Sequence, residues 1–330
     1  MLATMRNRRI YGAPDSCVYH CVTRTVNGEK LLGPREQSVL RKMLHQVVAF
    51  SGVELMTYAI MDNHLHVLVR VSDLARAITD YELIKRFKIL YPKPTNHQLF
   101  SPDEFAERLK RGDADAAKVR RQLLARMGDI SEFMRTLKQR FSIWFNKSHN
   151  RFGPLWSDRF KSAIIENDPS VVITVAAYID LNPVRAGIVE DPKDYPFCGY
   201  NEALAGHESL QLGLLAILQT DQLEHALADY RMILFGKGTQ PKQDGNGHTL
   251  NSEQSRAVNQ SLGEISTEEL LRHRLRFISN GTVIGSSEFV TAFIGKWSKR
   301  IGDVLQRMPK PIGSAHLPSM TTFRRVSEPK

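Results

Sequence analysis

The chain has few cysteines and no long apolar run, which argues against a disulfide-rich protein and against a membrane-spanning one. The three cysteines among 330 residues, Cys17, Cys21 and Cys198, cannot build a disulfide framework, and their odd number is typical of a reducing compartment. No stretch approaches the roughly eighteen apolar residues of a membrane span. Residues 1–9 also lack the apolar segment of a secretion signal. We therefore expect a cytoplasmic protein that does not enter a membrane.

Acidic residues are scarce relative to basic ones. The chain has 45 Lys and Arg against 35 Asp and Glu, a formal net charge of +10. An excess of this size indicates a polyanionic partner, most simply nucleic acid, although it also suits an ordinary basic protein. Apolar residues make up 42% of the chain, enough for a packed core, and the length allows one large domain or two modest ones.

The first 200 residues alternate between strand and helix patterns. The predicted elements are a strand over 18–26, a helix over 34–50, a hairpin of strands over 53–60 and 65–71, a helix over 131–146 capped by Ser131, a strand over 160–166, and a helix that begins after Asp168 and ends at Asn182. A polar, helical insertion over 72–130 interrupts the series. This order predicts an α+β fold in which helices flank one antiparallel sheet.

The segment after residue 200 has a different composition. We divide the chain into a domain over 1–200, a helical connector and linker over 201–252, and a basic, mainly helical extension over 253–330 with a disordered tail. From residue 270 onward there are eleven Lys and Arg against three acids. Two short helices near 267–278 and 286–301 are compatible with a DNA-binding helix-turn-helix or with a charged, solvated appendage.

A pair of histidines is the sharpest chemical feature. In Asn63-His64-Leu65-His66 the side chains alternate along a strand, so His64 and His66 share one face. Two neutral imidazoles at this spacing can ligate one divalent cation. The alternative is a pair of surface histidines on a half-exposed strand.

A tyrosine follows on a later helix. Tyr178 and Asn182 are four residues apart and share a helix face. A tyrosine hydroxyl, with a free pKa of about 10, becomes an effective nucleophile where a metal polarises the phosphate under attack. Asn182 offers an oxygen that could complete a site begun by the histidines. The alternative is a core tyrosine followed by a helix-ending Asn-Pro.

Basic and aromatic residues interleave between Ser131 and Lys161. Basic side chains track phosphates and aromatic faces stack on unpaired bases. Phe133, Phe141 and Phe145 have helical spacing and are expected in the core. The candidates for DNA contact are Arg140, Lys147, Arg151, Trp156 and Arg159.

Taken in order, these motifs resemble the single-tyrosine HUH transposases, and most closely the REP-associated tyrosine transposases. Asn63-His64-Leu65-His66 looks like the histidine, hydrophobe, histidine motif of that class. The segments 153–162 and 178–187 resemble two further signatures, and Tyr19-His20 with Val22 and Arg24 resembles the first strand. The resemblance covers about residues 10–200, interrupted by the insertion.

The resemblance implies a ferredoxin-like or RRM-like sheet that carries the histidines, with a tyrosine helix beside it. It implies that His64, His66 and, in third place, Asn182 ligate Mg²⁺ or Mn²⁺. It further implies that Tyr178 attacks single-stranded DNA at hairpin or repeat sequences and forms a 5′-phosphotyrosine. Arg24 and Arg185, which lie in the matching segments, join the expected DNA contacts.

Two other functions remain open at this stage. The chain could be a DNA-binding or regulatory module that keeps the fold without catalysis, or a nickase of the broader HUH class. The sequence leaves the target DNA open, and both a monomer and a homodimer are compatible with it.

Overall fold

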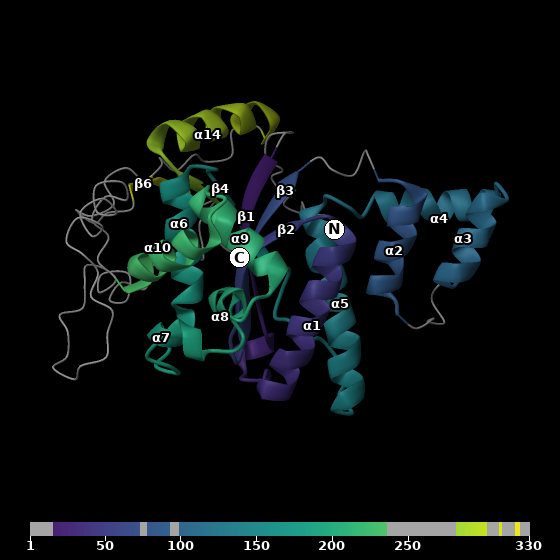
Figure 1. The fold of residues 1–330 in the computed structure, drawn as a ribbon, viewed down its shortest axis with the longest axis horizontal. Helices are drawn as coiled ribbons and strands as arrows, with labels where there is room; N and C mark the ends of the chain where they lie inside the picture. The colour runs from purple at the N-terminus through teal and green to yellow at the C-terminus, as the bar shows by residue number, and fades with distance from the viewer. Residues whose placement is uncertain are drawn as a thin grey trace, which may run out of the picture.

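An antiparallel sheet of four strands forms the centre of the protein (Figure 1). The computed structural model describes residues 16–72, 78–92, 99–235, 282–301, 310–311 and 321–323. The central strands are β1 (Ser16–Arg24), β2 (Glu54–Ile60), β3 (His64–Ser72) and β4 (Lys161–Ile165). They lie in the order β2-β3-β1-β4, and each pairs antiparallel with its neighbour. The predicted α+β fold with an antiparallel sheet is confirmed.

The register between β1 and β3 brings the histidine motif beside the first strand. Arg24 lies opposite His64, and Val22 lies opposite His66. Residues directly opposite each other share a face, so His20, two residues before Val22, also lies on the face of the histidine pair. β1 ends two residues earlier than predicted, because the chain turns through the short 3₁₀ helix η1 (Val26–Gly28), where Asn27 has a φ of 54°.

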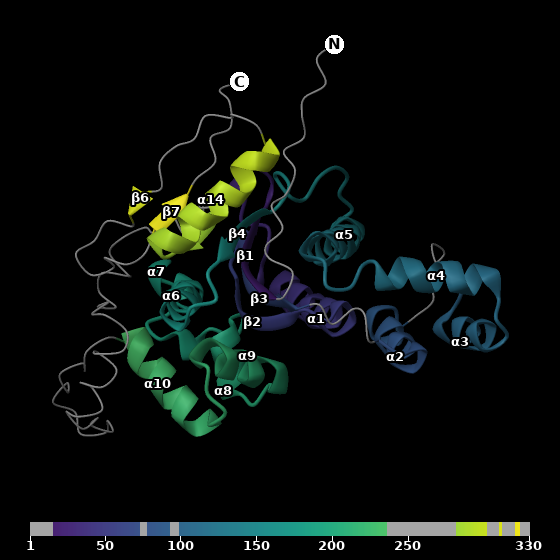
Figure 2. The same cartoon turned by 90° about the horizontal axis from the view of Figure 1, so that it is seen from above.

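Helices cover both faces of the sheet (Figure 2). On one face lie α1 (Pro34–Ser51) and α5 (Ile130–Ser148), and on the other lie α6 (Pro169–Asp180) and α9 (Glu208–Leu218). Both faces of β3 are therefore buried, and the alternative of a half-exposed histidine strand is wrong for His66, which is 3% exposed. No helix in the described ranges is both long and apolar enough to cross a membrane.

Capping residues set where the helices begin. Asp168 accepts from the amides of Ser170 and Val171 at the start of α6, and Pro169 follows at the first helical position, as predicted. The cap of α5 is Asp129, whose side chain accepts from the backbone amides of Ser131 and Glu132. The predicted Ser131 cap is wrong because the preceding aspartate already satisfies these first amides.

The insertion is helical, as predicted. It contains α2 (Asp80–Leu90), α3 (Pro102–Lys110) and α4 (Ala114–Leu124), which lie on the far side of α1 from the sheet (Figures 1 and 2). Its core residues include Leu83, Phe87 and Phe105, all buried.

The segment after α6 covers the edge strand β2. It contains α7 (Asn182–Arg185), the 3₁₀ helix η3 (Pro192–Asp194), α8 (Gly199–Leu204), α9 and α10 (Leu223–Phe235). The Ile60 amide donates to the Phe197 carbonyl at 2.9 Å, which occupies part of the open edge. Gly213 of α9 allows close approach, because a Cβ there would lie 2.4 Å from the Leu55 carbonyl oxygen of β2.

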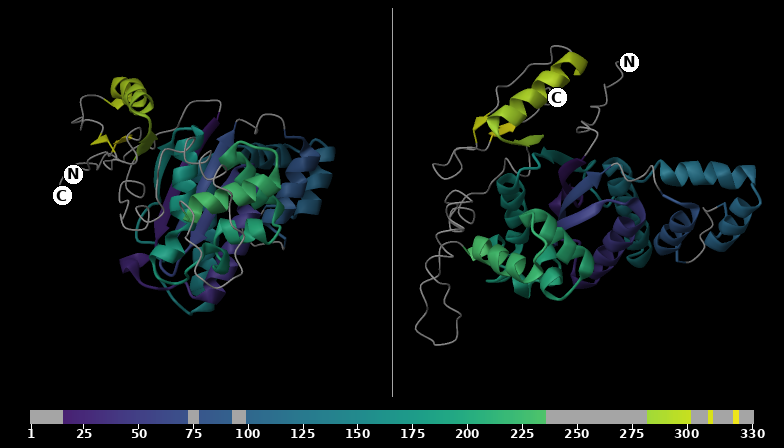
Figure 3. Two further views of the ribbon diagram at one scale, coloured as in Figure 1. Left: turned by 60° about the vertical axis from the view of Figure 1, so that its left-hand side comes forward. Right: turned by 45° about the horizontal axis from the view of Figure 1, so that its top comes forward.

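The C-terminal residues extend the sheet beyond β4 (Figure 3). β5 (Val283–Gly285) pairs parallel with β4, and β7 (Thr321–Phe323) and β6 (Lys310–Pro311) follow. Helix α14 (Ser287–Ile301) matches the predicted helix over 286–301. The prediction of a disordered tail is wrong for the residues of β6 and β7. The predicted helix over 267–278 and the linker over 236–252 lie outside the described residues.

A buried carboxylate fixes α6 against its surroundings. Asp180, 1% exposed, accepts hydrogen bonds from Thr57 Oγ1 of β2 at 2.8 Å, Tyr230 Oη of α10 at 2.7 Å and the Tyr200 amide of α8 at 3.2 Å. Burial raises the pKa of Asp180 to about 6, although these three donors favour the ionised form. One side chain therefore links four elements.

We expect this carboxylate to make stability fall as pH rises from about 4 to about 6. The folded state holds the Asp180 proton more tightly than the unfolded chain does. The stabilisation is therefore complete at pH values below the unfolded pKa and is lost as pH rises through the folded pKa. The loss is up to about 3 kcal/mol, from about 1.4 kcal/mol per pKa unit. Urea unfolding across this range should show the decrease of unfolding free energy with pH in the wild type and in the control variant Asp229→Asn. The decrease should be smaller in Asp180→Asn. Equal slopes in all three proteins would contradict the assignment.

Candidate active site

Three histidines from two neighbouring strands meet on the face of the sheet under α6. His20 Nε2 lies 2.9 Å from His66 Nδ1, and the two rings stack with centroids 5.1 Å apart. The His64 ring stands edge-on to His66, with centroids 4.9 Å apart. The predicted pair, His64 and His66, thus has a third member. Alternation along β1 puts His20 on this face, but the sequence does not give the register that brings it to His66.

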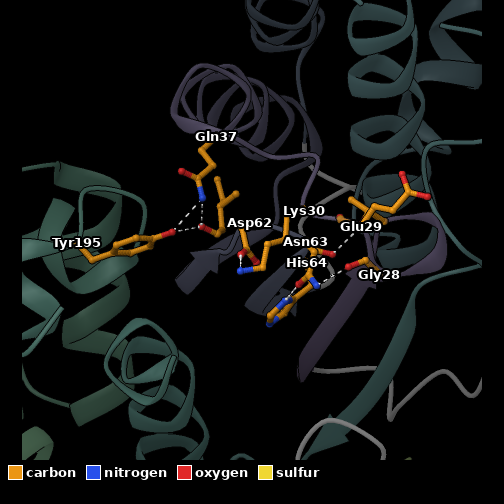
Figure 4. Close-up of polar contacts among 10 residues, drawn as sticks. Gly28, Glu29, Lys30, Gln37, Asp62, Asn63, His64 and Tyr195 are labelled. Atoms are coloured by element: carbon orange, nitrogen blue, oxygen red, sulfur yellow. Dashed lines mark hydrogen bonds and ion pairs between the residues drawn. The ribbon is translucent and has the colours of Figure 1, made fainter. Parts of the chain in front are cut away.

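The turn before β3 orients His64 (Figure 4). Asn63 Nδ2 donates to the Gly28 carbonyl at 2.8 Å, which holds the amide so that Asn63 Oδ1 faces His64 Nδ1 at 2.6 Å. Because Oδ1 can only accept, Nδ1 carries the His64 proton and Nε2 keeps its lone pair. Asp62, in the same turn, pairs with Lys30 at 3.0 Å.

Both motif histidines are neutral at physiological pH. Burial, with a smaller effect of the nearby Arg24 and Arg185 and against the opposing effect of Asp62, lowers the pKa of His64 to about 4. Burial also holds the pKa of His66 well below its usual value, and His64 and His20 add to this effect. The neutral imidazole is the form that ligates a metal.

The donor set fits a divalent cation. The Nδ1 atoms of His64 and His66 each lie against a second side chain, Asn63 and His20, and Nε2 of neither ring makes a hydrogen bond within the described part of the chain. Histidines that bind metals usually have this arrangement, in which the other ring nitrogen is fixed by an outer partner.

Tyr178 lies against these histidines. Its ring stands edge-on to His66, with centroids 5.9 Å apart, and edge-on to His20 at 6.3 Å. Arg185 of α7 stacks on the same ring, with Cζ 3.8 Å from its centroid, and donates through Nη2 to the Tyr178 carbonyl at 2.8 Å. Four predicted site residues from two distant segments thus come together: His64, His66, Tyr178 and Arg185.

Asn182 lies at the end of the same helix. Its Nδ2 donates to the carbonyls of Tyr178 at 3.0 Å and Ile179 at 3.1 Å. The amide nitrogen therefore caps the last turn of α6, and only Oδ1 is left for a cation. The predicted third-ligand role stays a prediction.

Some predicted DNA contacts lie at the end of the sheet where the histidine motif begins. Arg24 is exposed and lies opposite His64, and the Ser157 amide donates to the Arg24 carbonyl at 2.9 Å. This bond draws the loop between α5 and β4 to the same end of the sheet. Lys147 and Arg159, on either side of this loop, are exposed.

Other predicted DNA contacts have packing roles. Trp156 is 8% exposed, and its indole N–H donates to the Lys138 carbonyl at 3.2 Å. Arg140 donates to Gln46 Oε1 at 3.0 Å and lies over the Tyr91 ring. Arg151 is half-buried. The structure therefore does not place Trp156 where a base could stack on it.

Phe152 is an aromatic residue that the predicted contacts omitted. It is 91% exposed, on the loop between α5 and β4. The signal in the sequence is its position between Asn150-Arg151 and Gly153-Pro154, outside any helical spacing. An exposed aromatic ring next to a basic residue, here Arg151, suits base stacking.

Residues 14–98 match the family model described as "Transposase IS200 like". Over this segment the chain is similar to the IS200-like transposases. The matched segment contains β1, α1, β2 and β3, and so includes all three histidines but not Tyr178. The predicted resemblance to this class of transposases is confirmed.

A solved structure described as the REP-associated tyrosine transposase bound to a REP hairpin also matches. The identity is 17% and the TM-score 0.35, over 61% of this chain and 86% of that chain. A TM-score this low supports no further inference. A search of curated proteins gave no match.

Trp156 and Phe152, both on the loop between α5 and β4, should differ in how much they stabilise the fold. We expect Trp156→Ala to lower the free energy of unfolding by about 3–5 kcal/mol, because it empties a buried site. Phe152→Ala should change it by less than about 0.5 kcal/mol, because the ring is solvent-exposed. Denaturant unfolding measures both values, and a larger cost for Phe152→Ala would contradict the described loop.

Proposed function

We propose that the protein is a metal-dependent endonuclease and strand transferase of the transposase type, which cleaves single-stranded DNA at hairpin or repeat sequences through Tyr178. The observation that carries the proposal is the contact of Tyr178 with His66, a member of a neutral, pre-oriented histidine pair. The similarity to IS200-like transposases over the histidine-bearing strands supports the same function.

The chemistry follows from the residues that meet there. The Tyr178 hydroxyl oxygen attacks a backbone phosphorus, a P–O bond forms, and the bond from phosphorus to the 3′ oxygen breaks. The products are a 5′-phosphotyrosine and a DNA 3′-OH; the Tyr178 hydroxyl releases its proton to solvent, and the leaving 3′ oxygen takes one up from solvent. His64 and His66 would hold Mg²⁺ or Mn²⁺ through Nε2, with Asn182 Oδ1 as the candidate third ligand. The bound ion would supply Lewis-acid polarisation of the phosphate.

Arg185 would receive the phosphate. Its Nη1 is buried and has no hydrogen-bond partner among the described residues, while Nη2 is held by the Tyr178 carbonyl. A phosphate oxygen beside Tyr178 would satisfy Nη1 and compensate the charge that develops during attack. Burial lowers the pKa of Arg185, but an arginine stays charged at physiological pH.

The DNA strand would approach from the end of the sheet that carries Arg24. Arg24, Lys147 and Arg159 are exposed there or on the adjoining loop, and Phe152 adds an aromatic surface. Phosphate contacts from the basic side chains would position the strand, and stacking on Phe152 would hold an unpaired base.

One observation favours the second candidate function, a DNA-binding module without catalysis. Tyr178 is 7% exposed, and Arg185 lies across its ring. Cleavage requires Arg185 or α7 to move and admit the phosphate, whereas a binding module needs no such opening.

A denaturing-gel assay with labelled single-stranded hairpin oligonucleotides separates the two functions. We expect wild-type protein with Mn²⁺ or Mg²⁺ to form a protein-linked band, and Tyr178→Phe to bind the same DNA without forming one. Tyr200→Phe is the matched control, because Tyr200 is a tyrosine buried outside the histidine cluster, and it should keep the band.

A band that persists in Tyr178→Phe would remove Tyr178 as the nucleophile. Binding without any band in the wild type, across a panel of hairpin sequences, would support the non-catalytic module.

A further inference from the structure

Two histidines and a glutamate gather at the covered edge of β2, and none of them belongs to the candidate active site. They are His45 of α1, Glu202 of α8 and His207, the N-cap residue of α9. One ligand atom of each lies within 4.8 Å of the others. We propose that this cluster is a second cation site that binds a transition ion of the zinc class, independently of the proposed function.

The side chains already converge. His45 Nε2 lies 2.7 Å from Glu202 Oε2, and the rings of His45 and His207 stack with centroids 4.3 Å apart and 22° between their planes. His207 Nδ1 is buried and has no hydrogen-bond partner among the described residues. Ligands of a tetrahedral zinc ion lie roughly 3.3 Å apart, given metal bonds of about 2.0–2.2 Å. Small rotations of these side chains would therefore create the site.

The backbone and neighbouring side chains hold the three ligands in place. The His207 amide donates to the Glu202 carbonyl at 2.9 Å, so two ligands come from one tight connection between α8 and α9. The third ligand, His45, packs edge-on against the buried Tyr58 ring, with centroids 6.1 Å apart. Rigid support of this kind keeps ligands in a binding geometry.

A neighbouring arginine defines which side of Glu202 a cation would occupy. Arg41 Nε lies 3.6 Å from Glu202 Oε1, and Arg41 Nη1 donates to the Pro196 carbonyl at 2.9 Å. The carboxylate thus has one oxygen beside the guanidinium and the other, Oε2, beside His45. A metal on Oε2 leaves Arg41 as the outer partner of the carboxylate. Without metal, the same groups form a polar His45–Glu202–Arg41 cluster, in which His45 is hydrogen-bonded to Glu202 and Arg41 pairs with it.

The donor types select the ion. Two imidazoles and one carboxylate form a set typical of Zn²⁺, whereas Mg²⁺ prefers oxygen ligands alone. An ion at this position would connect α1 with α8 and α9, the helices that cover the edge of β2. We expect it to stabilise the attachment of the segment after residue 195 to the sheet.

Titration of the metal-free full-length protein with Zn²⁺, and separately with Co²⁺, tests the proposal. The wild type should bind one Zn²⁺ at this site, with a higher melting temperature, and Co²⁺ should give the visible absorption of a four-coordinate ion. His207→Ala removes a ring whose Nδ1 has no hydrogen-bond partner in the part of the chain that the structure describes, so the variant should fold. Its Zn²⁺ affinity should fall by more than the roughly 10–100-fold that is typical when a residue supporting a metal ligand, rather than a ligand itself, is removed.

Two controls identify the site that binds the ion. His225→Ala removes an exposed histidine of α10, and His64→Ala removes a ligand of the candidate active site; both should retain the zinc stabilisation. Unchanged affinity in both His45→Ala and His207→Ala, or no stoichiometric binding by the wild type, would overturn the proposal and leave only the polar cluster. Loss of the site in His64→Ala, with retention in His207→Ala, would overturn it too.

Discussion

The geometry of the candidate site depends on the buried carboxylate of Asp180. This side chain joins α6 to β2, α8 and α10 through three hydrogen bonds, and it does so despite the cost of burying a charge. Tyr178 lies two residues earlier on the same helix, and therefore points to a different side, where it meets His20 and His66. The anchor on one side of α6 thus sets the position of the tyrosine on the other.

Contacts with other side chains also fix the histidines. His64 and His66 lie in surroundings that disfavour positive charge, and each has one ring nitrogen held by another side chain. The result is a pair of neutral imidazoles whose ring orientations are set by the protein itself. Arg185 adds the complementary group, a half-buried guanidinium beside the tyrosine ring, whose buried Nη1 has no hydrogen-bond partner within the described ranges. Under the proposed function, these fixed charges and donors would stabilise a phosphate once Arg185 or α7 has moved to admit it.

Much of this arrangement could be predicted from local patterns. Alternation along the strand put His64 and His66 on one face, and Asp168-Pro169 and Asn182-Pro183 correctly bounded the tyrosine helix. What sequence reasoning missed depends on contacts between distant segments. His20 needs the β1–β3 register, Asp180 needs partners as distant as Thr57 and Tyr230, and the burial of Trp156 depends on its packing against α5. β5 needs β4 as a neighbour, and no local pattern reveals that pairing.

The central claim is that the histidine pair and Tyr178 form one metal-dependent site. Labelling the tyrosines with 3-fluorotyrosine and recording ¹⁹F NMR during Mn²⁺ titration tests it most directly, with the Tyr178 signal assigned by its absence in Tyr178→Phe. The account predicts that Mn²⁺ strongly broadens the Tyr178 signal in the wild type, and that this effect is lost in the variant with both His64→Ala and His66→Ala. A Tyr178 signal that stays sharp in the wild type, or broadens equally in the double variant, would contradict the account.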